Sequence, residues 1–184
     1  LEGGEELTGN DSQTGSLSIL DTSVVTALRT TIGNNGLLDG DGMLVSDTVT
    51  IGTGGTLNMT GEIVSNVVNK GGIVGGGLTV TGDYTQQDGI LQLALAGAGA
   101  GECDVLDVSG DIDLLGGSLD LDFVDGFTAL EAEGLALFRA GGDLTIDETV
   151  GFNISSGQPA FTIVPVEIFE NQGEVQLGTF ALLE

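Results

Sequence analysis

Apolar and polar residues alternate along most of the chain in short runs. The runs 16–20 and 24–28 come first, and Gly, Asn or Asp separates many of the later runs. Alternation with a period of two over four to six residues, bounded by turn-forming residues, predicts β-strands, because successive strand side chains point to opposite faces. We therefore expect an all-β protein built from many short strands.

A seven-residue pattern recurs within this alternation: apolar, any, apolar, Thr or Ser, Gly, acidic, apolar. Its copies are 57–63 (LNMTGEI), 78–84 (LTVTGDY) and 106–112 (LDVSGDI), so that the glycines at 61, 82 and 110 are 21 and 28 positions apart. Stacking the copies would align their apolar residues about 4.8 Å apart on one internal face. The glycine would supply the backbone angles of a tight corner.

A repeat of about 20 residues is typical of one turn of a parallel β-helix. The predicted fold is therefore a right-handed parallel β-helix (β-solenoid) with a C-terminal strand-rich capping unit. The longer step of 28 would hold a bulging loop, around 94–101. The alternative is an antiparallel β-sandwich, which also gives short alternating strands with turns.

The composition changes near the C-terminus. All seven Phe lie at position 123 or later, and both Pro residues, Pro159 and Pro165, lie in the same region. A solenoid needs a cap because its last turn exposes unpaired strand edges. We expect three parts: a polar N-terminal arm or cap (1–15), the β-solenoid coils (16–142), and a C-terminal cap or subunit-joining β unit (143–184).

The charge of the chain is strongly one-sided. There are 28 acidic residues, 3 basic residues and no His, which gives a net charge of −25. Nucleic acid is excluded as a partner because phosphate binding needs clustered Lys and Arg, and anionic membrane surfaces are excluded for the same reason. Membrane insertion is not expected, since no run of 18 apolar residues occurs. Cations are the natural counter-ligands.

The residue types that are missing also limit catalysis. Without His, the chain has no Ser–His or Cys–His nucleophile and no His-ligated zinc. The single Cys103 allows no internal disulfide. Nothing singles out a catalytic carboxylate pair for a glycosidase. The three basic residues are also too scattered to offer a polysaccharide lyase its proton abstractor. We expect a protein that is not an enzyme and requires no cofactor.

Two acidic groups are candidates for calcium, a hard cation that prefers oxygen ligands. In the first group, carboxylates alternate with apolar residues, so they would share the outer face of stacked strands. The second group lies in the turn sequence DGDG at 39–42. The candidate ligands are Asp39, Asp41, Asp111, Asp113, Asp120 and Asp122. The alternative interpretation is a solvated acidic surface that holds no ion.

Residues 71–142, which are 72 of the 184 residues, resemble the β-helix module of autotransporter passengers and other large secreted bacterial surface proteins. The matching segments are 77–86 (GLTVTGDYTQ), 89–93 (GILQL), 103–110 (CDVLDVSG), 115–121 (LGGSLDL) and 126–130 (GFTAL). The chain departs from the family at Cys103, where Tyr is common, and at 129–134, where Pro and Gly-Asp are common. The resemblance implies a parallel β-helix displayed outside the cell.

These observations predict a non-enzymatic extracellular structural protein, secreted or on the bacterial cell surface. Its solenoid subunits would self-associate through their ends into a homo-oligomeric filament, matrix or surface layer. The alternative is a fragment of a bacterial surface adhesin, an autotransporter-like passenger that binds a host receptor or a glycan.

Overall fold

The computed structural model describes residues 6–8, 15–97, 101–124, 127, 136–154, 169–171 and 175–177. Within these residues all regular structure is β, and 17 strands join into one sheet that does not close on itself. The strands are β1 (Glu6–Thr8), β2 (Gly15–Ile19), β3 (Val24–Ile32), β4 (Gly36–Gly40), β5 (Met43–Ile51), β6 (Thr56–Met59), β7 (Glu62–Gly75), β8 (Thr79–Thr81), β9 (Tyr84–Leu95), β10 (Leu106–Val108), β11 (Ile112–Leu114), β12 (Ser118–Phe123), β13 (Phe138–Ala140), β14 (Leu144–Ile146), β15 (Gly151–Ile154), β16 (Phe169–Asn171) and β17 (Val175–Leu177).

The strands pair in three columns, which we call A, B and C. Column A contains β2, β4, β6, 73–75 of β7, 90–95 of β9, β12 and β15. Column B contains 24–27 of β3, 43–46 of β5, 62–64 of β7, β8, β10, β13 and β16. Column C contains β1, 29–32 of β3, 48–51 of β5, 66–69 of β7, 84–86 of β9, β11, β14 and β17.

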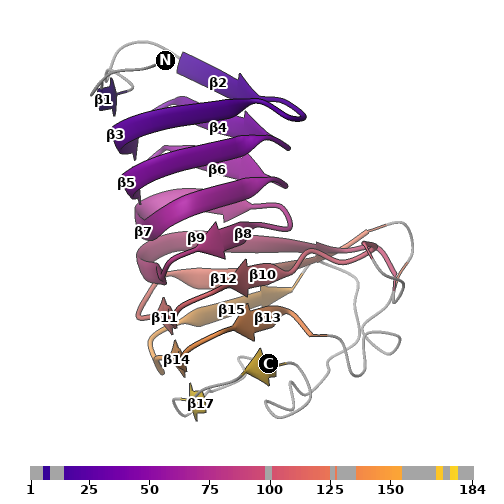
Figure 1. Cartoon of the computed structure of the whole chain (residues 1–184). Coiled ribbons are helices and arrows are strands. Elements are labelled where there is room, and N and C mark those ends of the chain that lie inside the picture. Colours follow the sequence, from indigo (N-terminus) through magenta and orange to yellow (C-terminus); the bar gives the residue numbers. More distant parts are fainter. Residues whose placement is uncertain are drawn as a thin grey trace.

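From β2 onward the chain visits the columns in the order A, B, C, and we call each such pass a rung. Figure 1 shows the rungs as a stack, with β2 and β3 at the top and β14 and β17 at the bottom. Every pairing between named strands is parallel. The all-β, parallel character predicted from the sequence is confirmed, and this pairing is incompatible with an antiparallel sandwich.

The length of a rung changes along the stack. In column C, Val67 pairs with Tyr84, 17 positions later. Tyr84 pairs with Ile112, 28 positions later, and Ile112 pairs with Leu144, 32 positions later. The extra residues lie between columns A and B, after β9 and again after β12. The first of these insertions agrees with the loop predicted around 94–101.

One part of the predicted repeat alignment is wrong. The copies 78–84 and 106–112 do stack, because Val80 pairs with Val108 and Tyr84 with Ile112. The copy 57–63 does not stack on 78–84, since its Ile63 pairs with Val80 rather than with Tyr84. The Thr-Gly pair at 60–61 turns the corner from column A to column B, whereas Thr-Gly at 81–82 and Ser-Gly at 109–110 lead from B to C. The same Thr/Ser-Gly sequence occurs at both kinds of corner because each requires a tight turn, whose backbone angles glycine adopts easily.

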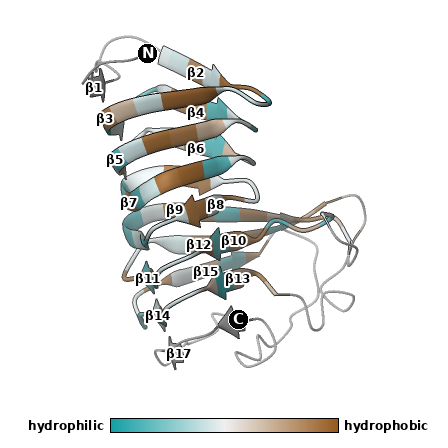
Figure 2. Cartoon of the chain, in the orientation of Figure 1, coloured by the Kyte–Doolittle hydropathy of each residue, from teal (hydrophilic) through white to brown (hydrophobic). Residues whose placement is uncertain are grey.

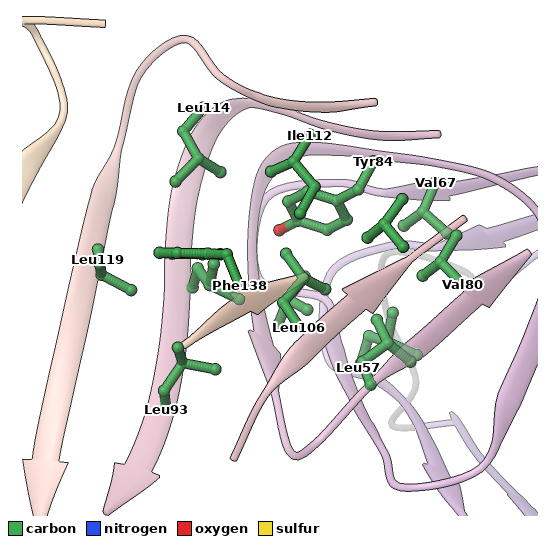
Figure 3. Close-up of a cluster of buried hydrophobic side chains, with 14 of the residues drawn as sticks. Leu57, Val67, Val80, Tyr84, Leu93, Leu106, Ile112, Leu114, Leu119 and Phe138 are labelled. Atoms are coloured by element: carbon green, nitrogen blue, oxygen red, sulfur yellow. The ribbon is translucent and has the colours of Figure 1, made fainter. Parts of the chain in front are cut away.

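Apolar side chains fill the space between the columns. Figure 3 shows Leu57, Val80, Leu93, Ile112 and Phe138 among the side chains that converge there from different strands. Each of these side chains is at most 1% exposed. Burial alternates along most strands, as in the buried–intermediate–buried pattern of β10, β11 and β14. The period-two alternation of the sequence therefore builds this core.

Glycine is required where column C leads into column A. Gly89 has a φ of +91°, and Gly117, one rung later, has a φ of +76°. A Cβ on Gly89 would collide with the backbone of Gly72, and a Cβ on Gly117 would collide with the backbone of Gly89. At this corner the rungs approach each other too closely for any side chain, which accounts for some of the 33 glycines in the chain.

The columns continue beyond residue 142. Strands β14 and β15 extend columns C and A, and β16 and β17 extend columns B and C. At the other end, β1 pairs with β3 in column C. The division of the chain into an arm (1–15), coils (16–142) and a cap (143–184) stays a prediction, and much of 155–184 lies outside the described residues.

Candidate functional site

A series of side-chain oxygens runs along the corner between columns B and C. The backbone N–H of Asp83 donates to Asn66 Oδ1 at 3.0 Å. The N–H of Asp111 donates to Asp83 Oδ1 at 3.1 Å, and the N–H of Asp143 donates to Asp111 Oδ1 at 2.8 Å. We call Asn66, Asp83, Asp111 and Asp143 the corner series. Each link joins one rung to the next.

The corner series accounts for the acidic position in two copies of the repeat, 78–84 and 106–112. At a corner the backbone N–H turns away from the regular strand pairing and needs another acceptor. A carboxylate or amide from the neighbouring rung supplies that acceptor, and a charged acceptor gives a stronger hydrogen bond. Ser109 also helps, because its Oγ accepts the N–H of Gly82 at 3.0 Å. Asp111, a predicted calcium ligand, therefore has a structural partner.

The other predicted ligands of the first acidic group lie on different columns. Asp113 is on β11 in column C, where its register neighbours are Thr85 and Thr145. Asp120 and Asp122 are on β12 in column A. The structure therefore separates Asp113 from Asp120 and Asp122 and does not gather the group on one strand face.

Asp120 lies among neutral polar side chains. Its register neighbours are Gln92 and Asn153. Asp120 Oδ1 accepts hydrogen bonds from Ser118 Oγ at 2.7 Å and from Asn153 Nδ2 at 2.8 Å. Asp122 stands opposite Ala94. Direct stacking of carboxylate on carboxylate, which would demand a cation, does not occur at these positions.

Asp39 and Asp41 lie at the N-terminal part of the stack. Asp39, on β4, has Ser18 and Asn58 as register neighbours, and its Oδ1 is buried without a hydrogen-bond partner. Asp41 Oδ1 accepts the backbone N–H of Asp21 at 2.6 Å. No cluster of three or more metal-binding side chains occurs among the described residues. The calcium sites stay a prediction.

Polar side chains inside the stack form a network that the sequence analysis did not identify. Tyr84 is fully buried, and its hydroxyl donates to Gln86 Oε1 at 3.2 Å. Gln86 Nε2 donates to the carbonyls of Gly116 and Ser118 at 3.0 and 3.1 Å. Asn69 makes a similar contact, because its Oδ1 accepts the N–H of Gly72 at 2.9 Å. These amides hold the glycine corner between columns C and A.

The side chains of Tyr84 and Asp147 have pKa values that differ from their usual ones. Burial raises the pKa of the Tyr84 phenol above its usual value, and the opposing effect of the hydrogen bond with Asn69 is smaller. The backbone and then the side chain of Thr149 donate hydrogen bonds to Asp147 and lower the pKa of that carboxyl. Tyr84 lies in the core and Asp147 at an exposed turn, so the two groups do not share a site.

The N-terminal end of the stack combines open strand edges with exposed apolar residues. Strand β2 and residues 24–27 of β3 each pair with one neighbour among the described residues. Leu20, Val24 and Leu28 are 60%, 55% and 59% exposed. In the register of the strands, Leu20 corresponds to Asp41 of the next rung, and Leu28 corresponds to Asp47. Figure 2 shows hydrophobic colouring on β3, β5 and β7 and more hydrophilic colouring on β10 and β13.

The C-terminal end also has open edges. Strands β15, β16 and β17 each pair with one preceding strand among the described residues. They occupy columns A, B and C, and they run parallel to the strands before them. Because β1 forms the column C edge at the N-terminal end, the two ends carry unpaired edges in the same three columns among the described residues. Such edges are the usual sites of strand addition.

The sequence pattern also missed a further copy of the corner motif. Residues 138–144 (FRAGGDL) stack on 106–112, because Val108 pairs with Ala140 and Ile112 with Leu144. This copy carries Gly141 where the pattern requires Thr or Ser. A search that accepted Gly at that position would have found it.

Comparison of the chain with protein-family models, curated proteins and solved structures found no match. In the described part of the chain there is no helix that is long and apolar enough to cross a membrane.

Proposed function

We propose that the stack is a right-handed parallel β-helix with a C-terminal strand-rich unit that joins one subunit to the next. The repeated order of columns A, B and C supports a single continuous coil. The right-handed sense follows from a general rule: about 98% of crossovers between parallel strands of one sheet are right-handed.

The function that we propose is structural. The protein is a non-enzymatic subunit that associates end to end into a filament, matrix or surface layer outside the cell. The open parallel edges in the same three columns at both ends carry this proposal. A heterologous contact between unlike ends repeats without limit unless it closes into a ring, and so builds an extended assembly.

The charge of the chain fits such a role. A net charge of −25 keeps separate subunits apart at low ionic strength. Screening by salt shortens the range of that repulsion to about 8 Å at about 0.15 M. An acidic surface of this kind suits salty extracellular surroundings. The resemblance of 71–142 to secreted bacterial β-helix modules supports the same location.

The second candidate function is that of an adhesin fragment that binds a host receptor or a glycan. The observation that favours it is the growth of the rung from 17 to 28 and then 32 residues. Both insertions fall between columns A and B, and loops that a rigid scaffold positions often carry binding sites.

Electron microscopy of the purified protein tests the structural proposal. Three conditions are compared: calcium, a chelator, and magnesium at the ionic strength of the calcium sample. End-to-end filaments or lattices are the expected result. Their appearance with calcium alone would support a specific role for the acidic residues, whereas equal assembly with magnesium would indicate screening. Short isolated rods in all three conditions would contradict self-association and favour the adhesin candidate.

A further inference from the structure

The N-terminal end of the stack is partly covered by β1. This strand pairs with residues 29–31 of β3 in column C. In the same rung, β2 in column A and residues 24–27 in column B keep open edges among the described residues. One of the three columns is thus extended at this end, while the other two are not.

The order of the columns shows which place β1 occupies. Each rung runs from A through B to C, and the first complete rung begins with β2. The strand before β2 in this order is a column C strand, and β1 holds that place. If a second copy continued the stack beyond the N-terminal end of the first copy, its β15, β16 and β17 would extend columns A, B and C. Its β17 would then meet the edge of β3 that β1 already covers.

The register leads to the same place. Leu7 of β1 stands opposite Thr30, and Val175 of β17 stands opposite Leu144. Following column C from Val175 leads through residues 144, 112, 84, 67 and 49 to Thr30. Val175 of a second copy and Leu7 therefore compete for one register position. Both residues are apolar, and Thr30 at this position is buried.

Net charge does not distinguish the two ends. Residues 1–35 have five acidic residues and one basic residue, for a net charge of −4. The segment 136–177 has six acidic residues and one basic residue, for a net charge of −5. The columns and the register therefore carry the choice of partner strand.

We propose that β1 is a displaceable cap, and that β17 of a second copy replaces it on β3 when two copies join end to end. This inference rests on the proposed end-to-end association and names its strands. The partner is a second copy, because its C-terminal end presents parallel edges in the required three columns. Strand β1 covers three residues of β3, so a competing strand has few hydrogen bonds to displace.

A disulfide lock tests the cap. Thr8 and Thr31 are register partners, and Thr31 is partly exposed. Neighbouring parallel strands lie about 4.8 Å apart, within the Cα separation that a disulfide spans. The lock is Thr8→Cys with Thr31→Cys in a Cys103→Ser background. The matched control is Val68→Cys with Thr85→Cys in that background, a register pair in the same column far from the end.

Sedimentation velocity measures assembly of the parent Cys103→Ser protein and both variants. We expect the oxidised lock to assemble at least about tenfold less than the parent, and a reductant to restore assembly. The oxidised control pair should assemble like the parent. Equal assembly of the oxidised lock and the parent would overturn the cap, while leaving end-to-end association intact.

A second variant separates the two proposals if the parent stays monomeric. Leu7→Asp places a charge opposite the buried Thr30 and weakens β1. Assembly of this variant alone would support the cap, because removing β1 would then be what permits contact. Monomers in both proteins would overturn the cap and the proposed function together.

Discussion

At the scale of single residues, the acidic side chains have more than one role. In the corner series, Asp83 and Asp111 accept backbone N–H groups from the following rung. Asp113, two residues further on, lies on an outer strand face between Thr85 and Thr145. Residues of one type in one short segment thus differ in what they contribute to stability. Substitutions can separate these roles.

Asp111→Ala should lower the free energy of unfolding by about 1–2 kcal/mol, because the N–H of Asp143 loses its acceptor. Asp111→Asn should lower the free energy of unfolding much less, because at Asn66 an amide oxygen accepts the equivalent backbone N–H. Asp113→Ala is the control and should leave stability nearly unchanged. Urea unfolding with a chelator present measures all three. Equal effects of the Ala and Asn variants at 111 would contradict the acceptor role.

Tyr84 should couple stability to alkaline pH. Its folded-state pKa lies above the unfolded value, so the neutral phenol stabilises the fold fully below about pH 10. That contribution is lost as the pH rises past the unfolded pKa. Tyr84 is the one Tyr in the chain, so tyrosinate absorbance should appear together with unfolding. Ionisation of the phenol in a still-folded protein would contradict this expectation. Tyr84→Phe should remove this component of the pH dependence.

At the scale of strands and corners, the length of each strand depends on the corner that follows it. Strand β7 continues from column B through column C into column A without a break. Most later strands stop at each corner, where Gly82, Gly110 or Gly117 interrupts the strand. The amides of Asn69 and Gln86 hold the inside of the corners. Corner chemistry therefore sets where each strand ends.

Gly89→Ala should destabilise the fold by about 3 kcal/mol. It combines the cost of a positive φ, about 1–2 kcal/mol, with a collision against the backbone of Gly72. Gly101→Ala is the matched control, because Gly101 has a φ of +82° but no atom within 4 Å of its Cβ position. Gly101→Ala should therefore incur only the cost of the positive φ. Thermal unfolding of both variants measures the difference, and equal losses would contradict the close approach at the corner.

At the scale of the whole molecule, charge and open edges act against each other. The unpaired strands at the two ends favour association, while a net charge of −25 opposes it. The exposed Leu20, Val24 and Leu28 at the N-terminal end add apolar surface that also favours association. Ionic strength should therefore control association.

Raising the salt concentration from about 0.02 M to about 0.2 M should increase the assembled fraction, because the Debye length falls to roughly 7 Å. Sedimentation velocity at fixed protein concentration measures this fraction. Leu20→Ser with Leu28→Ser should lower it at both salt concentrations. The matched control is Leu115→Ser, an exposed Leu on a later rung, which should have little effect. A fraction that does not change with salt would contradict control by charge.

The sequence by itself determined the all-β class, the strands at 16–20 and 24–28 and the need for glycine at corners. These are local properties, because alternation follows from the period of two in an extended backbone. Only the tertiary structure decided which copies of the repeat stack, and it placed Ile63 opposite Val80, where the repeat alignment predicted Met59. It also decided that Gln86 lies in the core and that Asp83 and Asp111 link adjacent rungs. Register is non-local: rungs of 17 to 32 residues bring together positions whose spacing no short pattern contains.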